Sequence, residues 1–140
     1  MTRKLLFILI PVLYIGFASC KTSQIAQKPG MFVVTVLYPD GEGKTFDMDY
    51  YEKKHMPMVA GFIGKNLQFY TIDKGVGGRT PNDKAPYVAA CHFYITNVAE
   101  YGAAMGKNRE AIVGDFKNYT NITPVIQVSE VKQVVRKVKS

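Results

Sequence analysis

Residues 31–38 read MFVVTVLY, and residues 87–95 read YVAACHFYI. Both stretches are rich in β-branched and aromatic side chains and lie beside turn-forming residues, so each predicts a β-strand. An antiparallel strand that is covered on one face alternates apolar and polar residues, whereas these two are largely apolar on both faces. We therefore expect both faces of this sheet to be covered.

A helix and a further strand are expected between these two strands. Asp47 can cap the first exposed amides of a helix, and Pro57 should kink or divide that helix. Residues 66–75 then predict a strand, and 76–86 form a loop rich in Gly, Pro and Asn. The helical side chains that recur at spacings of three and four, and so should share one face, are Met48, Tyr51, His55, Met58, Val59 and Phe62.

A second helical region and a last strand complete the pattern. Asn97 and Glu100 have the spacing of a capping box, and Gly106 and Gly114 predict a broken helix or two short helices over 98–116. Residues 124–131 predict the fourth strand. The order of elements, βαββαβ, indicates an α+β protein of the ferredoxin-like type with an antiparallel four-stranded sheet. Two helices cover one face only, so the simplest cover for the other face is a second copy, in a homodimer.

The start of the chain predicts export. Arg3 and Lys4 precede the uncharged run 5–18, which is shorter than the roughly 20 residues of a spanning helix and is typical of a secretory signal. The run ends in Phe17-Ala18-Ser19-Cys20, which resembles the lipobox of bacterial lipoproteins and implies acylation of Cys20. We predict a signal peptide at 1–19, a tether at 20–30 and an extracytoplasmic, membrane-anchored protein. An ordinary signal peptide, with Cys20 an incidental thiol, is the alternative.

The composition of the chain limits which binding partners we expect. The chain has 140 residues and a formal net charge of +7, and basic residues gather in a polar tail at 133–140. No nucleic-acid motif accompanies this charge, so we expect no nucleic-acid partner. Cys91 lies in an apolar stretch and should be a buried free thiol. The two histidines have no ligand spacing, so we expect no metal site.

Several segments in one register resemble the EthD-like family, over about residues 32–131. They are FDMDYY at 46–51, HMPMV at 55–59, PYVA at 86–89, CHFY at 91–94, NYTNI at 118–122 and PVIQVSEV at 124–131. The resemblance implies an EthD-like domain at 31–132 that forms a dimeric α+β barrel, with a pocket between sheet and helices in each subunit. It also implies oxidoreductase-like chemistry without a cofactor, with haem as a minority alternative.

His55 and Tyr51 are the candidate catalytic residues, because both lie on the apolar face of the first helix, one turn apart. An imidazole can take up or release a proton near neutral pH, and burial would favour the neutral base. A core histidine bonded to Tyr51 or to a backbone carbonyl is the alternative. The candidate ligand-binding residues are Tyr38, Phe62, His92 and Phe116, with His92 facing either the pocket or the dimer interface.

Three functions are compatible with the sequence. The first is a cofactor-free oxidoreductase or isomerase that acts on a small apolar or aromatic molecule, with His55 as base and Tyr51 as a polar helper. The second is a non-catalytic module that binds a hydrophobic ligand outside the cytoplasm. The third is a membrane-tethered structural dimer whose pocket is filled by side chains. The fold alone selects none of them.

Overall fold

The structure is a computed structural model that describes residues 26–135. The predicted signal segment at 1–19, the lipidation site Cys20, the first part of the tether and residues 136–140 of the basic tail lie outside the described residues. No helix within residues 26–135 is both long and apolar enough to cross a membrane.

Four antiparallel strands form one sheet, in the order β2-β3-β1-β4. The two apolar stretches of the sequence become the central strands, and the other two strands lie at the edges. This arrangement confirms the predicted α+β, ferredoxin-like fold. The strands are β1 (Phe32–Pro39), β2 (Leu67–Lys74), β3 (Tyr87–Ile95) and β4 (Val125–Glu130).

The helices begin where the sequence predicted. The Tyr50 amide donates to Asp47 Oδ1 over 3.0 Å, and the Glu100 amide donates to Asn97 Oδ1 over 3.1 Å. The second region divides at Asn108, whose side chain donates to the Ala104 carbonyl over 2.8 Å. The helical elements are α1 (Met48–Tyr50), the π-helical η1 (Tyr51–His55), α2 (Met56–Ile63), the 3₁₀ turn η2 (Gly64–Asn66), α3 (Val98–Lys107), α4 (Arg109–Asp115) and the 3₁₀ turn η3 (Phe116–Asn118).

The π turn corrects one part of the predicted helix face. Pro57 has no amide proton to continue the α-helical ladder, and the preceding turn widens so that the Met56 amide bonds to the Tyr51 carbonyl. The extra residue rotates α2 relative to the residues before it. Ile63 therefore points into the core, whereas Phe62, predicted on that face, is only half-buried and lies outside the core cluster.

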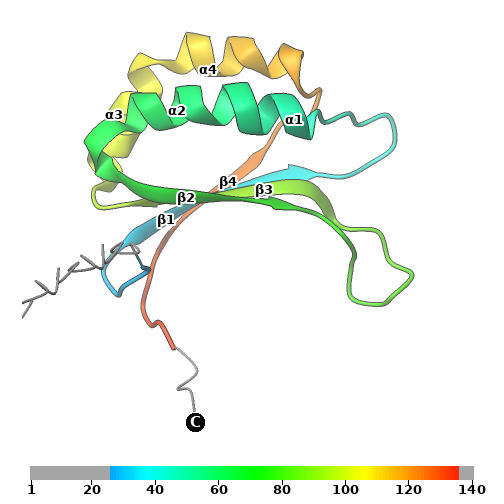
Figure 1. Ribbon diagram of the computed structural model, residues 1–140, viewed down its shortest axis with the longest axis horizontal. Coiled ribbons are helices and arrows are strands. Elements are labelled where there is room, and N and C mark those ends of the chain that lie inside the picture. The colour runs from blue at the N-terminus through cyan, green and yellow to red at the C-terminus, as the bar shows by residue number, and fades with distance from the viewer. Residues whose placement is uncertain (1–25, 136–140) are drawn as a thin grey trace, which may run out of the picture.

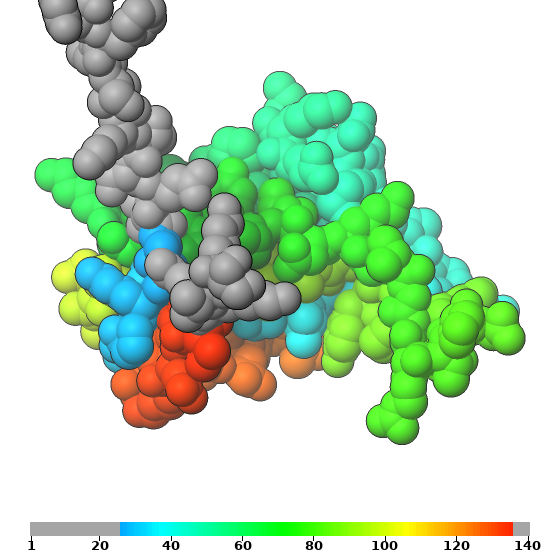
Figure 2. Space-filling view, turned by 60° about the horizontal axis from the view of Figure 1, so that its bottom comes forward, coloured from blue at the N-terminus to red at the C-terminus, as the bar shows by residue number. Residues whose placement is uncertain are grey.

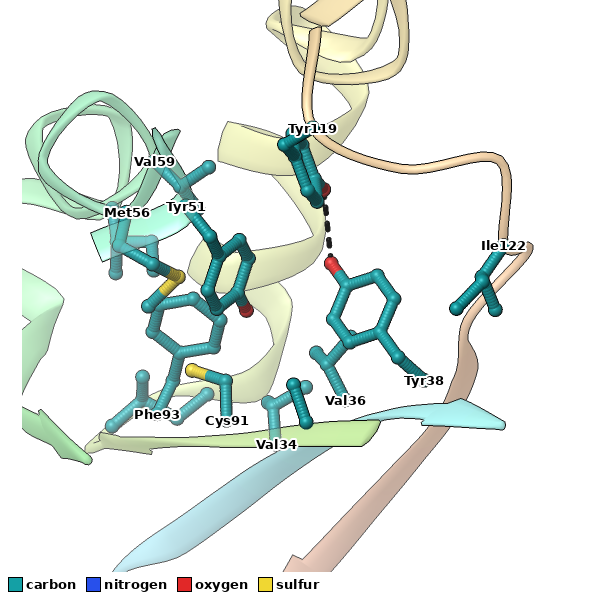
Figure 3. Packing of buried hydrophobic residues seen from close by; sticks show 13 residues of the cluster. Val34, Val36, Tyr38, Tyr51, Met56, Val59, Cys91, Phe93, Tyr119 and Ile122 are labelled. Atoms are coloured by element: carbon teal, nitrogen blue, oxygen red, sulfur yellow. Dashed lines mark hydrogen bonds between the residues drawn. The ribbon is translucent and has the colours of Figure 1, made fainter. Parts of the chain in front are cut away.

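All helices lie on one face of the sheet (Figure 1). Beneath them, Val34, Val36 and Tyr38 of β1 pack with Cys91 and Phe93 of β3, and Tyr51 reaches down toward them from the helical layer (Figure 3). Cys91 is a buried free thiol, as predicted, and burial raises its pKa to about 12. These contacts hold the helices over β1 and β3.

Within residues 26–135, no helix covers the opposite face of the sheet, which is turned toward the viewer in Figure 2. Val33 and Leu37 of β1 and Ala90 of β3 are half-buried on this face. Between these apolar positions, His92 is in register with Thr71 on one side and with Thr35 on the other. We call this side of the sheet the open face. It combines apolar positions with polar ones, among them the row of Thr71, His92 and Thr35 across the strands.

Candidate functional site

A cavity of about 280 Å³ lies between the sheet and the helices. Its inner wall is apolar and buried, and its mouth includes Val113 of α4 and Ile126 of β4, which are 49% and 58% exposed. The lining residues are Val36, Tyr38, Tyr51, His55, Met56, Val59, Phe93, Tyr101, Met105, Gly106, Arg109, Ile112, Val113, Phe116, Pro124 and Ile126. Such a cavity suits a small apolar or aromatic molecule.

His55 and Asp115 form a hydrogen-bonded pair at this cavity. The Nδ1 atom of His55 lies 2.9 Å from Asp115 Oδ2, and the two side chains are 4% and 15% exposed. Asp115 also accepts hydrogen bonds from the Tyr50 hydroxyl over 2.8 Å and from the Asn118 amide over 2.7 Å. Burial opposes the charge on Asp115, but these three donors outweigh it and lower the pKa of the carboxyl group.

A chain of hydrogen bonds continues from His55 to the sheet. The Tyr119 hydroxyl lies 3.2 Å from His55 Nε2. It also lies 3.0 Å from the Tyr38 hydroxyl, the bond that is dashed in Figure 3. Because the ionised Asp115 can only accept, His55 Nδ1 carries the proton and Nε2 accepts from Tyr119. Tyr119 has a single proton, so its oxygen must accept from Tyr38. The four side chains therefore form one directed path from Tyr38 to Asp115, which we call the relay.

The environment keeps the relay neutral apart from Asp115. Burial lowers the pKa of His55, although the neighbouring Asp115 acts in the opposite direction. Burial also raises the pKa of Tyr38 and of Tyr119 above the ordinary value of a phenol. At neutral pH the imidazole is thus an unprotonated base at Nε2, and both tyrosines are phenols that can pass a proton without holding a charge.

The structure brings together most of the predicted site. His55, Tyr51, Tyr38 and Phe116 all line the cavity. The ring of Tyr51 stacks on that of His55, with 5.5 Å between the ring centroids. Tyr51 thus contributes its ring to the cavity wall beside His55.

Two predicted ligand-binding residues lie elsewhere. Phe62 is not part of the cavity lining, because the π turn rotates α2 away from the simple helical register. His92 lies on the open face, where its Nδ1 atom is 3.0 Å from Thr35 Oγ1 and its Nε2 atom is 3.2 Å from Asp73 Oδ2. Strand alternation places it opposite the side chains of Cys91 and Phe93, which face the helices.

Asp115 and Tyr119 are the residues of the relay that the sequence did not single out. They lie 60 and 64 positions after His55, so no local spacing links them to it. Tyr119 falls within the segment NYTNI that carried the family resemblance, which was the one available signal. Asp115 lies in a region expected to be helical, where an acidic residue is usually solvated.

The residues present do not favour a haem or metal centre. Both ring nitrogens of His55 already have partners, so haem ligation through His55 would require the relay to open. Across residues 26–135, no group of three or more His, Cys, Asp or Glu side chains could hold a metal ion.

Comparisons with known proteins agree with this fold. The model of the EthD domain matches residues 39–122. The crystal structure of an EthD-like protein from Ralstonia eutropha is similar, with 41% identity, a TM-score of 0.71, and coverage of 79% of this chain and 97% of that one. An ethyl tert-butyl ether D (EthD) family protein from Bacillus halodurans shares the fold, with 17% identity, a TM-score of 0.53 and coverage of 71% and 97%. No curated protein matches the chain.

Proposed function

This chain belongs to the EthD family, and from that premise we propose that it binds a small apolar or aromatic molecule in its cavity and exchanges a proton with it through the relay. The observation that carries the proposal is the path of hydrogen bonds from Tyr38, on the cavity wall, through Tyr119 to His55 and Asp115. Such a path would supply general acid–base catalysis.

The chemical step follows from the direction of the relay. A ligand with an acidic proton passes it to the Tyr38 oxygen, Tyr38 passes its own proton to Tyr119, and Tyr119 passes its proton to His55 Nε2. The resulting imidazolium is held by the Asp115 carboxylate, 2.9 Å away. An isomerase would return the proton to another atom of the ligand. An oxidoreductase would need dioxygen to accept the electrons of the deprotonated ligand.

Two probe reactions test this function. Indanone, an aromatic ketone, should exchange the protons beside its carbonyl for deuterium in the presence of the protein, as followed by NMR. Naphthol should drive oxygen uptake if the chemistry is oxidative. Either activity should fall by about a hundredfold or more in His55→Gln, the scale of general acid–base catalysis, and His92→Gln is the matched control with little change. Equal activity in both variants would remove the relay from the mechanism.

A binding module without catalysis is the second candidate. The observation in its favour is that both ring nitrogens of His55 already have protein partners, so no ring nitrogen is free for a ligand. In that case naphthol should bind with no probe reaction, and His55→Gln should bind it as well as the wild type. Phe116→Ala, which removes a wall side chain, should weaken binding, whereas Phe62→Ala should not.

The open face supports a homodimer. It leaves the apolar side chains of Val33, Leu37 and Ala90 only half-buried, and a second copy would cover them. Analytical ultracentrifugation of the unlipidated chain should detect a dimer at micromolar concentration. A monomer at all concentrations would exclude this assembly.

We also propose the membrane anchor from the sequence alone. Cys20 follows Ala18 and Ser19 behind a short apolar run, as in bacterial lipoproteins. In a bacterial host, the wild-type chain should fractionate with the membrane, and Cys20→Ser should be released from it. Retention of the variant in the membrane fraction would contradict lipid anchoring through this residue.

A further inference from the structure

Arg109 adds a positive charge to a cavity whose lining is largely apolar. It is the first residue of α4, and its exposed side chain belongs to the cavity lining. His55 is the other lining residue able to carry a positive charge, and burial favours its neutral form. Before any proton is transferred, the charge that a bound ligand meets is therefore that of Arg109.

The guanidinium group of Arg109 is available to a ligand. Among the described residues, the ion pairs involve lysines and histidines, and none includes Arg109. Asp115 is the carboxylate of the relay, and its oxygens already accept from His55, Tyr50 and Asn118. A planar guanidinium without a protein partner is suited to a carboxylate, which it can bind through two parallel hydrogen bonds.

The shape of the cavity sets the orientation of such a ligand. Val36 and Phe93, on the sheet, are buried and form the inner end. Val113 and Ile126 are half exposed and belong to the mouth, and Arg109 lies four residues before Val113 at the start of α4. An apolar ring would lie against the sheet, while an anionic group stays at the mouth, where water still reaches it.

We propose that Arg109 is an anion-binding residue of this cavity and that the natural ligand is a small aromatic or apolar carboxylate. The inference rests on the proposed function only in that the cavity binds a ligand. It adds the chemical class of that ligand and a residue that selects it.

Naphthoate and naphthamide test the proposal, because they share a ring system and differ in charge. Isothermal titration should show that the wild-type chain binds naphthoate about fivefold more tightly than naphthamide, the size expected for an ion pair that water reaches. Arg109→Gln should bind the two equally. Arg109→Lys should keep part of the preference, and Lys107→Gln, an exposed cation just before α4, should keep all of it.

The outcomes separate the two proposals. Equal binding of both compounds by the wild type, or the same loss in Arg109→Gln and Lys107→Gln, would overturn the role of Arg109 and leave the relay untouched. A preference for naphthoate that disappears only in Arg109→Gln would support it, even if His55→Gln does not alter the probe reactions. Binding of neither compound would overturn the cavity as a ligand site and both proposals with it.

Discussion

Each of the two histidines lies beside an aspartate carboxylate, and the two pairs lie on opposite faces of one sheet. His55 and Asp115 lie under the helices, where they are 4% and 15% exposed. His92 and Asp73 lie on the open face, where they are 28% and 59% exposed. The covered pair is hydrogen-bonded over 2.9 Å and the open pair is in contact over 3.2 Å, and burial is the main difference between their surroundings.

That difference decides what each pair can do. Under the helices, desolvation lowers the pKa of His55, and the pair continues into a buried chain of tyrosines. On the open face, water screens the pair, and its further partner is Thr35. A second copy on this face would remove water from His92 and Asp73 as well. The difference in burial between the two pairs therefore depends on the oligomeric state.

The largest expected effect concerns the second copy that is proposed to cover the open face. Leu37→Arg places a charge on the open face beside Ala90 and Val125. In a dimer built on this face, the two arginines would be buried without partners, and the dissociation constant should rise by at least about a hundredfold. Ala103→Arg, on an exposed position of α3, is the control and should remain dimeric. Light scattering that shows dimers in both variants would place the interface elsewhere.

The second effect compares the aspartates. Asp115→Ala leaves three donors, on His55, Tyr50 and Asn118, without their acceptor, and should lower the free energy of unfolding by about 3 kcal/mol. Asp73→Ala removes a screened partner and should cost less than about 1 kcal/mol. Urea unfolding of both variants measures the difference. Similar losses would mean that burial does not separate the pairs.

The third effect is the pH dependence of the covered pair. Burial lowers the pKa of folded His55 below about 6.5, its value in the unfolded chain. At a pH between the folded and the unfolded pKa, His55 is protonated in the unfolded chain but not in the folded one. The contribution of His55 to the free energy of unfolding is therefore complete above about pH 6.5 and decreases below it. The limiting slope is about 1.4 kcal/mol per pH unit.

Unfolding in urea at several pH values should show this slope for the wild type and a flatter profile for His55→Gln. The lowered pKa of Asp115 acts in a separate window, below about pH 4, where its stabilising charge is lost. An unchanged slope in His55→Gln would assign the pH dependence to other groups.

The fold was predictable because its signals are local. Each predicted feature depends on residues within a few positions of one another. These features are the two apolar strands, the helix caps at Asp47 and Asn97, and the break in the second helical region. The site was predictable in part: helical spacing put Tyr51 and His55 on one face, and both line the cavity.

The remainder of the site depends on tertiary structure. The contact between His55 and Asp115 joins the first helical region to the end of the second, and no local pattern encodes it. The π turn before Pro57 changes the helical register, and Phe62 therefore does not lie on the helix face where it was predicted. Strand alternation predicted correctly that His92 shares a strand face with Ala90 and Tyr94. It does not predict which face of the sheet the helices cover, because that depends on how the chain crosses the sheet.

The smallest effect is the most informative about the open face. A double-mutant cycle of His92→Gln and Asp73→Ala measures the coupling within the open pair. In the Leu37→Arg background, where water reaches the pair, the coupling should be no more than about 0.5 kcal/mol. In the dimer, the same pair would be desolvated, and its coupling should rise toward that of His55 with Asp115, measured by the equivalent cycle. A coupling that is the same in both backgrounds would show that the pair stays in water, so the second copy, if present, does not cover His92.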